Sequence, residues 1–515
     1  MSRRRLARRN APFFILLLLL AAAEAGARPG GGQGFSGGGH SYGGSHSSGG
    51  GYGGSHSSGS GYRGSHSYGG GGSSSGGSGS LSSADGGFGC GLTLLALLLC
   101  VIALRQLSGP ADTSDTAWDS PLPAPSRDLG IIRGLDPDFS AVLFEDFVYA
   151  LYARAHGARA SRKDLDSLAP YLSAPTRDAL AARPPLGVPV SAVVIGALHV
   201  RSVHLPAAGT PATQVWVSLG IESNLTTGEP GSEQTLYVQE TWDLAREATV
   251  RTRPPEAVRS FHCPSCGAPF ASSAGDRCAF CYELVSSGRF DWTVMSVRLE
   301  ASETRPPALT GTVEEQGTGL LTIDHPAKDS NFEQLLRDDP AVTREALAAR
   351  LHLIYSELNA AWTALDLRPI RPYVSDNLFD YLQYWIKAYR RQGLRNVLEG
   401  MRITRHELVK VVRDRWFDAV TFRVWGTGRD TTVRVSTGEL VGGRPDRDRE
   451  YSEYWTLIRG AGVRGAARTD KACPNCGGAL DVNQAGQCAH CGSHITRGEF
   501  DWVLSRIEQD DSYTG

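Results

Sequence analysis

Eight of the ten cysteines fall into two quartets that share one spacing, C-x2-C-x11-C-x2-C. The quartets are Cys263, Cys266, Cys278 and Cys281, and then Cys473, Cys476, Cys488 and Cys491. A C-x2-C pair forms a tight turn in which both thiolates can reach one ion, and two such pairs complete a tetrahedral site. The spacing therefore predicts two structural Zn²⁺ ions, held in zinc ribbons at 263–281 and 473–491.

Four sulfur ligands leave no open coordination position, which favours a structural metal over a hydrolytic one. Disulfides, an iron–sulfur cluster, or a ligand drawn from His262, His490 and His494 are the alternatives. Short-spaced quartets in a large chain are more typical of metal sites than of disulfides. We expect the three histidines to lie beside the ribbons or on the surface.

Candidates for catalysis are missing from the sequence. His406-Glu407 has no second histidine at zincin spacing, and neither a phosphate loop nor a nucleophile elbow occurs. We therefore expect no enzyme and identify no small-molecule substrate. The net charge of −2 gives no bulk attraction for nucleic acid. Arg277 and Arg289 beside the first ribbon are too few for strong phosphate binding, although ribbon contact with nucleic acid stays an alternative.

The first 130 residues predict targeting and membrane attachment. Residues 1–27 resemble a signal peptide, with an arginine-rich start, an apolar run and a small-residue cleavage site, although an uncleaved anchor is the competing interpretation. Residues 28–87 form a Gly/Ser/His-rich tract that predicts a disordered tether. The uncharged apolar stretch 88–104 predicts one transmembrane helix, and 105–130 predicts a linker.

The cysteines also bear on location. Metal-binding thiolates must stay reduced, so we expect a single-pass protein of the cell (inner) membrane with cytoplasmic C-terminal domains. The sequon at Asn224 would matter only if its domain faced outside.

Ordered matches along the rest of the chain indicate an internal repeat, with offsets that drift only from 202 to 213. Besides the quartets, the matched segments are Asp136-Pro137 with Asp339-Pro340, 170–173 with 372–375, Gly196 with Gly400, 240–242 with 453–455, and 290–292 with 500–502. The repeat predicts two domains, 131–303 and 330–510, joined by a linker at 304–329.

Each copy begins with helical patterns and continues with strand patterns. The second copy predicts a helix over 347–365 and another after Ser375-Asp376; the first copy matches with an apolar face from Phe139 to Leu151 and a second helix that stops at Pro184-Pro185. The predicted strands are 193–203, 215–221 and 236–244, then 397–403, 408–412, 419–425, 431–435 and 451–458, with a last strand starting at each Phe-Asp-Trp triplet. Helices followed by a run of strands predict an α+β domain with an antiparallel sheet.

Two side-chain groups on the second helix of the second copy have competing interpretations. We expect the aromatic residues Tyr381, Tyr384, Trp385 and Tyr389 to pack in a core, and a ligand pocket is the alternative. We expect the basic residues Lys387, Arg390, Arg391 and Arg395 to form a solvated face, and contact with acidic lipid is the alternative.

The second copy resembles the Tim-forty-four-like domain family, which is named for the membrane-binding subunit of the mitochondrial import motor. The resemblance lies in Asp339-Pro340, in 360–362, in the DLRPIRPYVSD run at 366–376, in 453–456 and in the strand beginning at Trp502. It implies cone-like domains of the nuclear transport factor two-like class, membrane association and a binding role. The duplication and the ribbons depart from the import subunit.

Together these features predict a membrane-anchored, non-catalytic scaffold that binds lipid, an unidentified protein partner, or both. The rival interpretation is a domain cone that holds a small ligand or a cryptic enzymatic site.

Overall fold

The computed structural model describes residues 128–207, 213–229, 231–274, 276–304, 309, 318–510 and 512–515. The predicted signal peptide, tether, transmembrane helix and nearly all of the linker before residue 130 lie outside these residues. Among the helices of the described part, none is long and apolar enough to cross a membrane.

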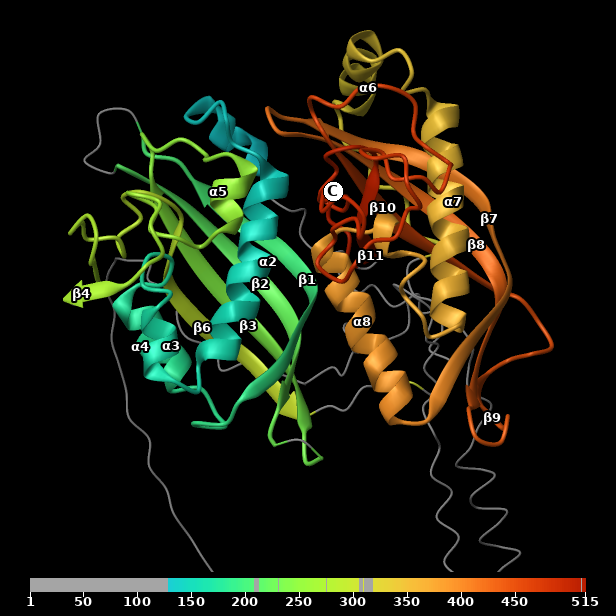
Figure 1. The fold of residues 1–515 in the computed structure, drawn as a ribbon, viewed down its shortest axis with the longest axis horizontal. Coiled ribbons are helices and arrows are strands. Elements are labelled where there is room, and N and C mark those ends of the chain that lie inside the picture. The colour runs from blue at the N-terminus through green and yellow to red at the C-terminus, as the bar shows by residue number, and fades with distance from the viewer. Residues whose placement is uncertain are drawn as a thin grey trace, which may run out of the picture. The chain divides into compact units, whose positions relative to one another are not determined.

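In each half of the described chain, helices come first and long strands follow (Figure 1). They are η1 (Leu129–Gly134), α2 (Ala141–Ala158), α3 (Arg162–Asp166), α4 (Ala174–Ala181), β1 (Val190–His204), β2 (Gln214–Thr227), β3 (Gln234–Glu247), α5 (Pro255–Arg259), β4 (Ser272–Ala274), β5 (Arg277–Cys278), β6 (Thr293–Thr304), α6 (Lys328–Asp338), α7 (Arg344–Thr363), η2 (Arg371–Tyr373), α8 (Asp376–Arg391), β7 (Leu394–Arg413), β8 (Phe417–Arg434), β9 (Leu440–Gly443), β10 (Arg449–Gly460) and β11 (Val503–Gln509).

The first half is a four-stranded antiparallel sheet, in the order β1-β2-β3-β6, with α2 lying across one face (Figure 1). Ser140 caps α2, because its Oγ accepts a hydrogen bond from the Leu143 amide at 3.2 Å. The core between helix and sheet contains the fully buried rings of Tyr152, Tyr171 and Trp242. Burial of large aromatic side chains is the main source of stability in such a layer.

The second half is an antiparallel sheet in the order β11-β10-β8-β7, with β9 paired to β8. Helices α7 and α8 bury Trp362 and Trp385 against a core that includes Trp455 of β10. Ser375 caps α8 as expected, since its Oγ accepts from the Leu378 amide at 3.3 Å. Both halves are thus mixtures of helices and antiparallel sheet, as the sequence predicted.

The strand predictions for the second half were wrong in one respect. The pairs 397–403 with 408–412, and 419–425 with 431–435, are single long strands, β7 and β8. Gly400 adopts φ +62° where the β7–β8 register shifts between Glu399 and Arg402. A second register shift, between Ile403 and Arg405, falls at the break between the two predicted segments, where residues 404–407 are polar, so β7 looks like two strands in the sequence. The Phe-Asp-Trp triplets also precede β6 and β11 rather than opening them.

Part of the segment expected to be a linker packs on the second sheet. The Ile323 amide donates to Tyr454 Oη at 3.1 Å, and Arg423 donates to the Leu320 carbonyl at 2.8 Å. Helix α6 then begins at Lys328. The body of the second half therefore includes residues from about 320 onward.

The two halves contact each other through apolar and polar side chains. Val142 and Leu143 of α2 join Phe417, Ala419, Ile458 and Val503 in one buried cluster. Trp416 Nε1 donates to the Asp138 carbonyl at 3.0 Å. The halves therefore share a small core of their own.

Candidate metal centres

Each cysteine quartet lies in a connection between two neighbouring strands. Residues 263–281 lie between β3 and β6, and residues 473–491 lie between β10 and β11. Because the flanking strands are paired, each ribbon starts and ends on the same sheet. The ribbons are insertions at one point of a sheet.

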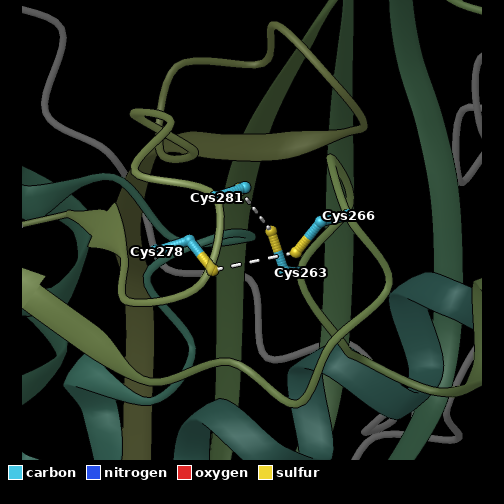
Figure 2. Close-up of side chains that lie close together, drawn as sticks. All are labelled: Cys263, Cys266, Cys278 and Cys281. Atoms are coloured by element: carbon cyan, nitrogen blue, oxygen red, sulfur yellow. Dashed lines mark hydrogen bonds between the residues drawn. The ribbon is translucent and has the colours of Figure 1, made fainter.

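The sulfur atoms of each quartet converge. All four lie within 4.8 Å of one another, and Figure 2 shows the first quartet brought together from two loops. The Sγ–Sγ distances are 3.8 Å for Cys263–Cys281, 4.0 Å for Cys266–Cys278 and 3.8 Å for Cys473–Cys491. A tetrahedron with metal–sulfur bonds near 2.3 Å has sulfurs about 3.8 Å apart. A disulfide would need about 2.05 Å, and the eight cysteines are free thiols in this structure.

Four matching turns shape the two ribbons. In each turn the residue after the second cysteine donates its amide to the carbonyl of the first, as in Gly267 to Cys263 at 2.8 Å and Gly477 to Cys473 at 2.9 Å. That residue has positive φ in every turn: Gly267 +77°, Tyr282 +61°, Gly477 +71° and Gly492 +73°. Three of these residues are glycine, which adopts positive φ at little cost, and Tyr282 is the exception.

Hydrogen bonds favour the thiolate form at the last cysteine of each quartet. Bonds from Ser493 and from the Asn475 side chain lower the pKa of Cys491 to about 5. The backbone amide of Glu283 lowers the pKa of Cys281 to about 7. Burial instead raises the pKa of Cys263 to about 12, so that thiol needs a cation to ionise. Deprotonated sulfurs are the form that binds metal, so each quartet suits a divalent ion.

A buried arginine ties each ribbon to its half. Arg177 of α4 donates to Asp276 Oδ1 in the first ribbon and to the Leu172 carbonyl, both at 2.5 Å. Arg371 of η2 donates to the Gln484 carbonyl in the second ribbon at 3.0 Å. Both side chains are at most 4% exposed. The ribbons are therefore fixed to the body and do not hang from it.

The nearby histidines do not join the clusters. Among the described residues, the groups with metal-ligand geometry contain cysteines alone. His494 Nε2 lies 3.9 Å from Asp376 Oδ2, and its ring Nδ1 is 3.5 Å from Thr496 Oγ1. Burial lowers the pKa of His494 to about 4, so this imidazole is neutral near pH 7.

The other predicted groups fall where the sequence placed them. Tyr384, Trp385 and Tyr389 are buried in the core, with Tyr381 partly buried beside them. The basic side chains on the same helix and just after it, Lys387, Arg390, Arg391 and Arg395, are exposed. Asn224, the sequon residue, is only 4% exposed within β2, so its amide is inaccessible in the folded protein.

The sequence did not predict a charged cluster buried in the first half. Glu240 Oε2 lies 3.0 Å from His156 Nε2 and accepts from Trp242 Nε1 at 2.9 Å, while Oε1 is 3.2 Å from Arg183 Nη2. Burial alone would raise the pKa of Glu240, but the histidine, arginine and indole groups together lower it to about 2. The repeat drew attention to Glu240 and Trp242, but the other groups that contact Glu240 are His156 of α2 and Arg183 of the loop after α4.

The fold that carries the second quartet also has a recognisable sequence pattern. Residues 329–467 match the Tim44-like domain. This is the Tim-forty-four-like family that the sequence resembles. The Tim44-like domain begins within α6 and its matched range ends before Cys473, so it covers the helices and most of the sheet of the second half.

Other comparisons add little to the Tim44-like assignment. Comparison with curated proteins gave no match. One similar solved structure is described as an "Ntf2 like protein involved in plasmid conjugation", with 9% identity and a TM-score of 0.16, over 72% of this chain and 97% of that chain. A TM-score this low does not establish a shared fold.

Proposed function

We propose that this protein is a membrane-anchored, non-catalytic scaffold that holds a partner at the bilayer through protein or lipid contacts. The observation that carries the proposal is the Tim44-like domain at 329–467, because domains of this family are associated with membranes and with protein interactions. The apolar stretch 88–104 would supply the anchor.

We further propose that 131–303 is a second copy of the same domain as 330–510. Buried ion pairs at matching positions support this. Arg246 donates to Asp136 Oδ2 at 2.8 Å in the first half, and Arg459 donates to Asp339 Oδ2 at 3.0 Å in the second. Each guanidinium also lies 4.7 Å from the ring of the tryptophan in its Phe-Asp-Trp triplet.

A second matched contact also favours the duplication. Trp242 Nε1 donates to Glu240, and Trp455 Nε1 donates to Glu453, both at 2.9 Å. Buried polar groups need specific partners, so the same pairing at the same place in two unrelated domains would be an unlikely coincidence.

The metal in each ribbon is proposed to be a structural Zn²⁺. The eight cysteines would hold the two ions, which would fix loops whose apolar clusters contain only a few side chains. Closed tetrathiolate sites offer no position for a substrate, which fits a binding role. The reduced thiolates favour a cytoplasmic location for both domains.

Cell fractionation tests the membrane anchor. The full chain should stay with membranes after an alkaline carbonate wash, and a variant lacking residues 88–104 should be released. A full chain that washes off, or a deletion variant that remains, would contradict anchoring by this segment.

Vesicle binding by the deletion variant separates lipid from protein contact. Retention on vesicles with anionic headgroups, weakened by Arg391→Gln with Arg395→Gln, would identify the exposed basic face as a lipid contact. The matched control is Arg444→Gln, an exposed arginine in the β9–β10 connection. Without retention, the scaffold would have to act through a protein partner, which cross-linking in intact cells would recover.

A further inference from the structure

We propose that the first half contains a binding site for one small oxyanion, a carboxylate or a phosphate, formed by Arg159 and Arg183 beside Glu240 and His156. This inference is independent of the proposed scaffold function and rests on the buried cluster alone.

The cluster holds more positive than negative charge. Arg159, at the C-terminal end of α2, is 6% exposed, and the Arg183 side chain is 11% exposed. Among the described residues, ion pairs connect this cluster to Glu240 and to no other carboxylate. Two guanidinium groups thus face one carboxylate in a place where charge is poorly solvated. Such an excess is costly unless an anion balances it.

Several donors in the cluster have no acceptor. Arg183 Nε and Arg159 Nε are buried without a hydrogen-bond partner, and the buried Glu240 Oε1 also lacks a hydrogen bond. Arg183 Nη2 faces Glu240 Oε1 at 3.2 Å without hydrogen-bond geometry. The one bond from Arg159 is a long one, from Nη2 to the Pro184 carbonyl at 3.4 Å. Buried polar atoms of native proteins are almost always satisfied, so this group of donors calls for an acceptor.

The matching Glu–Trp pair of the second half, Glu453 and Trp455, has different neighbours. There the other oxygen of Glu453 accepts from the neutral amide of Gln509 at 3.1 Å. The positions on α7 that correspond to His156 and Arg159, at the offset of 203, are Asn359 and Trp362. Arg159 is therefore not required by the Glu–Trp pair and is a feature of the first half.

Guanidinium chemistry defines the ligand class. A guanidinium presents planar N–H donors that match the oxygens of carboxylate and phosphate, and paired arginines are common at such sites. Burial lowers the pKa of Arg159, the nearby Glu240 carboxylate raises it in part, and the Arg183 charge lowers it again, with a net downward shift. The partial exposure of Arg183 leaves a route from solvent to the cluster.

Calorimetric titration of the full chain with inorganic phosphate, and separately with acetate, tests the site at constant ionic strength. We expect saturable binding of one anion per chain by the wild type. Arg183→Gln should weaken it about tenfold or more, because a charge-assisted pair of bonds is lost. The control is Arg201→Gln, which removes a half-exposed arginine of the same half that pairs with Glu300.

Absence of saturable binding by the wild type would overturn the proposal, whatever the variants do. Equal weakening in Arg183→Gln and Arg201→Gln would also overturn it. If Arg183→Gln does not fold, Arg159→Gln is tested in its place. An Arg159→Gln variant that binds the anion as tightly as the wild type would count against the site.

Discussion

At the scale of single residues, charge burial links Glu240 to acid stability. Its pKa is lowered to about 2 in the folded protein, compared with an ordinary value near 4.5. A carboxyl with a lowered folded pKa stabilises the protein fully above its unfolded pKa, and this contribution is lost as pH falls toward the folded pKa. We therefore expect stability to decline between about pH 4.5 and pH 2, by roughly 3 kcal/mol from this group.

Glu240→Gln should remove that contribution. The variant should be less stable than the wild type near neutral pH and should lose less stability on acidification, as measured by urea unfolding at a series of pH values. Glu450→Gln changes an exposed carboxylate and serves as the control. If the Glu240→Gln variant loses as much stability on acidification as the wild type, Glu240 is not the source of the acid sensitivity.

The positive-φ residues of the ribbons give a second residue-scale prediction. Gly477→Ala should destabilise the second ribbon by about 1–2 kcal/mol, because alanine resists φ +71° although nothing lies within 4 Å of the added methyl group. Tyr282→Gly should leave the first ribbon as stable or more stable. Zinc retention during urea titration would measure the stability of the ribbon in each variant. A Gly477→Ala variant that is more stable than the wild type would refute the turn assignment.

At the scale of elements, the buried arginines fix the ribbons. Arg177→Met should cost about 3–5 kcal/mol, because it leaves Asp276 and the Leu172 carbonyl without their partner. It should also speed the loss of metal from the first ribbon to a chelator. The control is Arg162→Met, which removes an arginine that is 49% exposed and pairs with Asp166 and Asp178. It should change neither the stability of the protein nor the rate of metal loss by much. Similar metal loss in both variants would show that Arg177 does not hold the ribbon.

The elements also show what the sequence could predict. Helix α8 followed from its Ser375 cap and its apolar face, since both signals are local. Strands β7 and β8 were each predicted as two, because residues 404–407 of β7 are polar and residues 426–430 of β8 contain two glycines and two charged residues. Cysteine spacing is local too, and it located both candidate metal centres. The Arg183–Glu240 contact joins segments far apart in sequence, and no local pattern marks it.

At the scale of the whole molecule, the duplicated ribbons make the account testable with one variant. The quartets lie in equivalent connections of two sheets, and their sulfurs are spaced for a tetrahedral metal. If each quartet holds its own ion, losing one should leave the other in place, because stability terms at distant sites are nearly independent.

Metal analysis of the purified full chain tests this central claim most directly. Elemental analysis should find two zinc ions per chain, and Cys473→Ser with Cys488→Ser should leave one. A chain without zinc whose eight cysteines are oxidised to one another, or one whose bound metal is iron, would contradict the account.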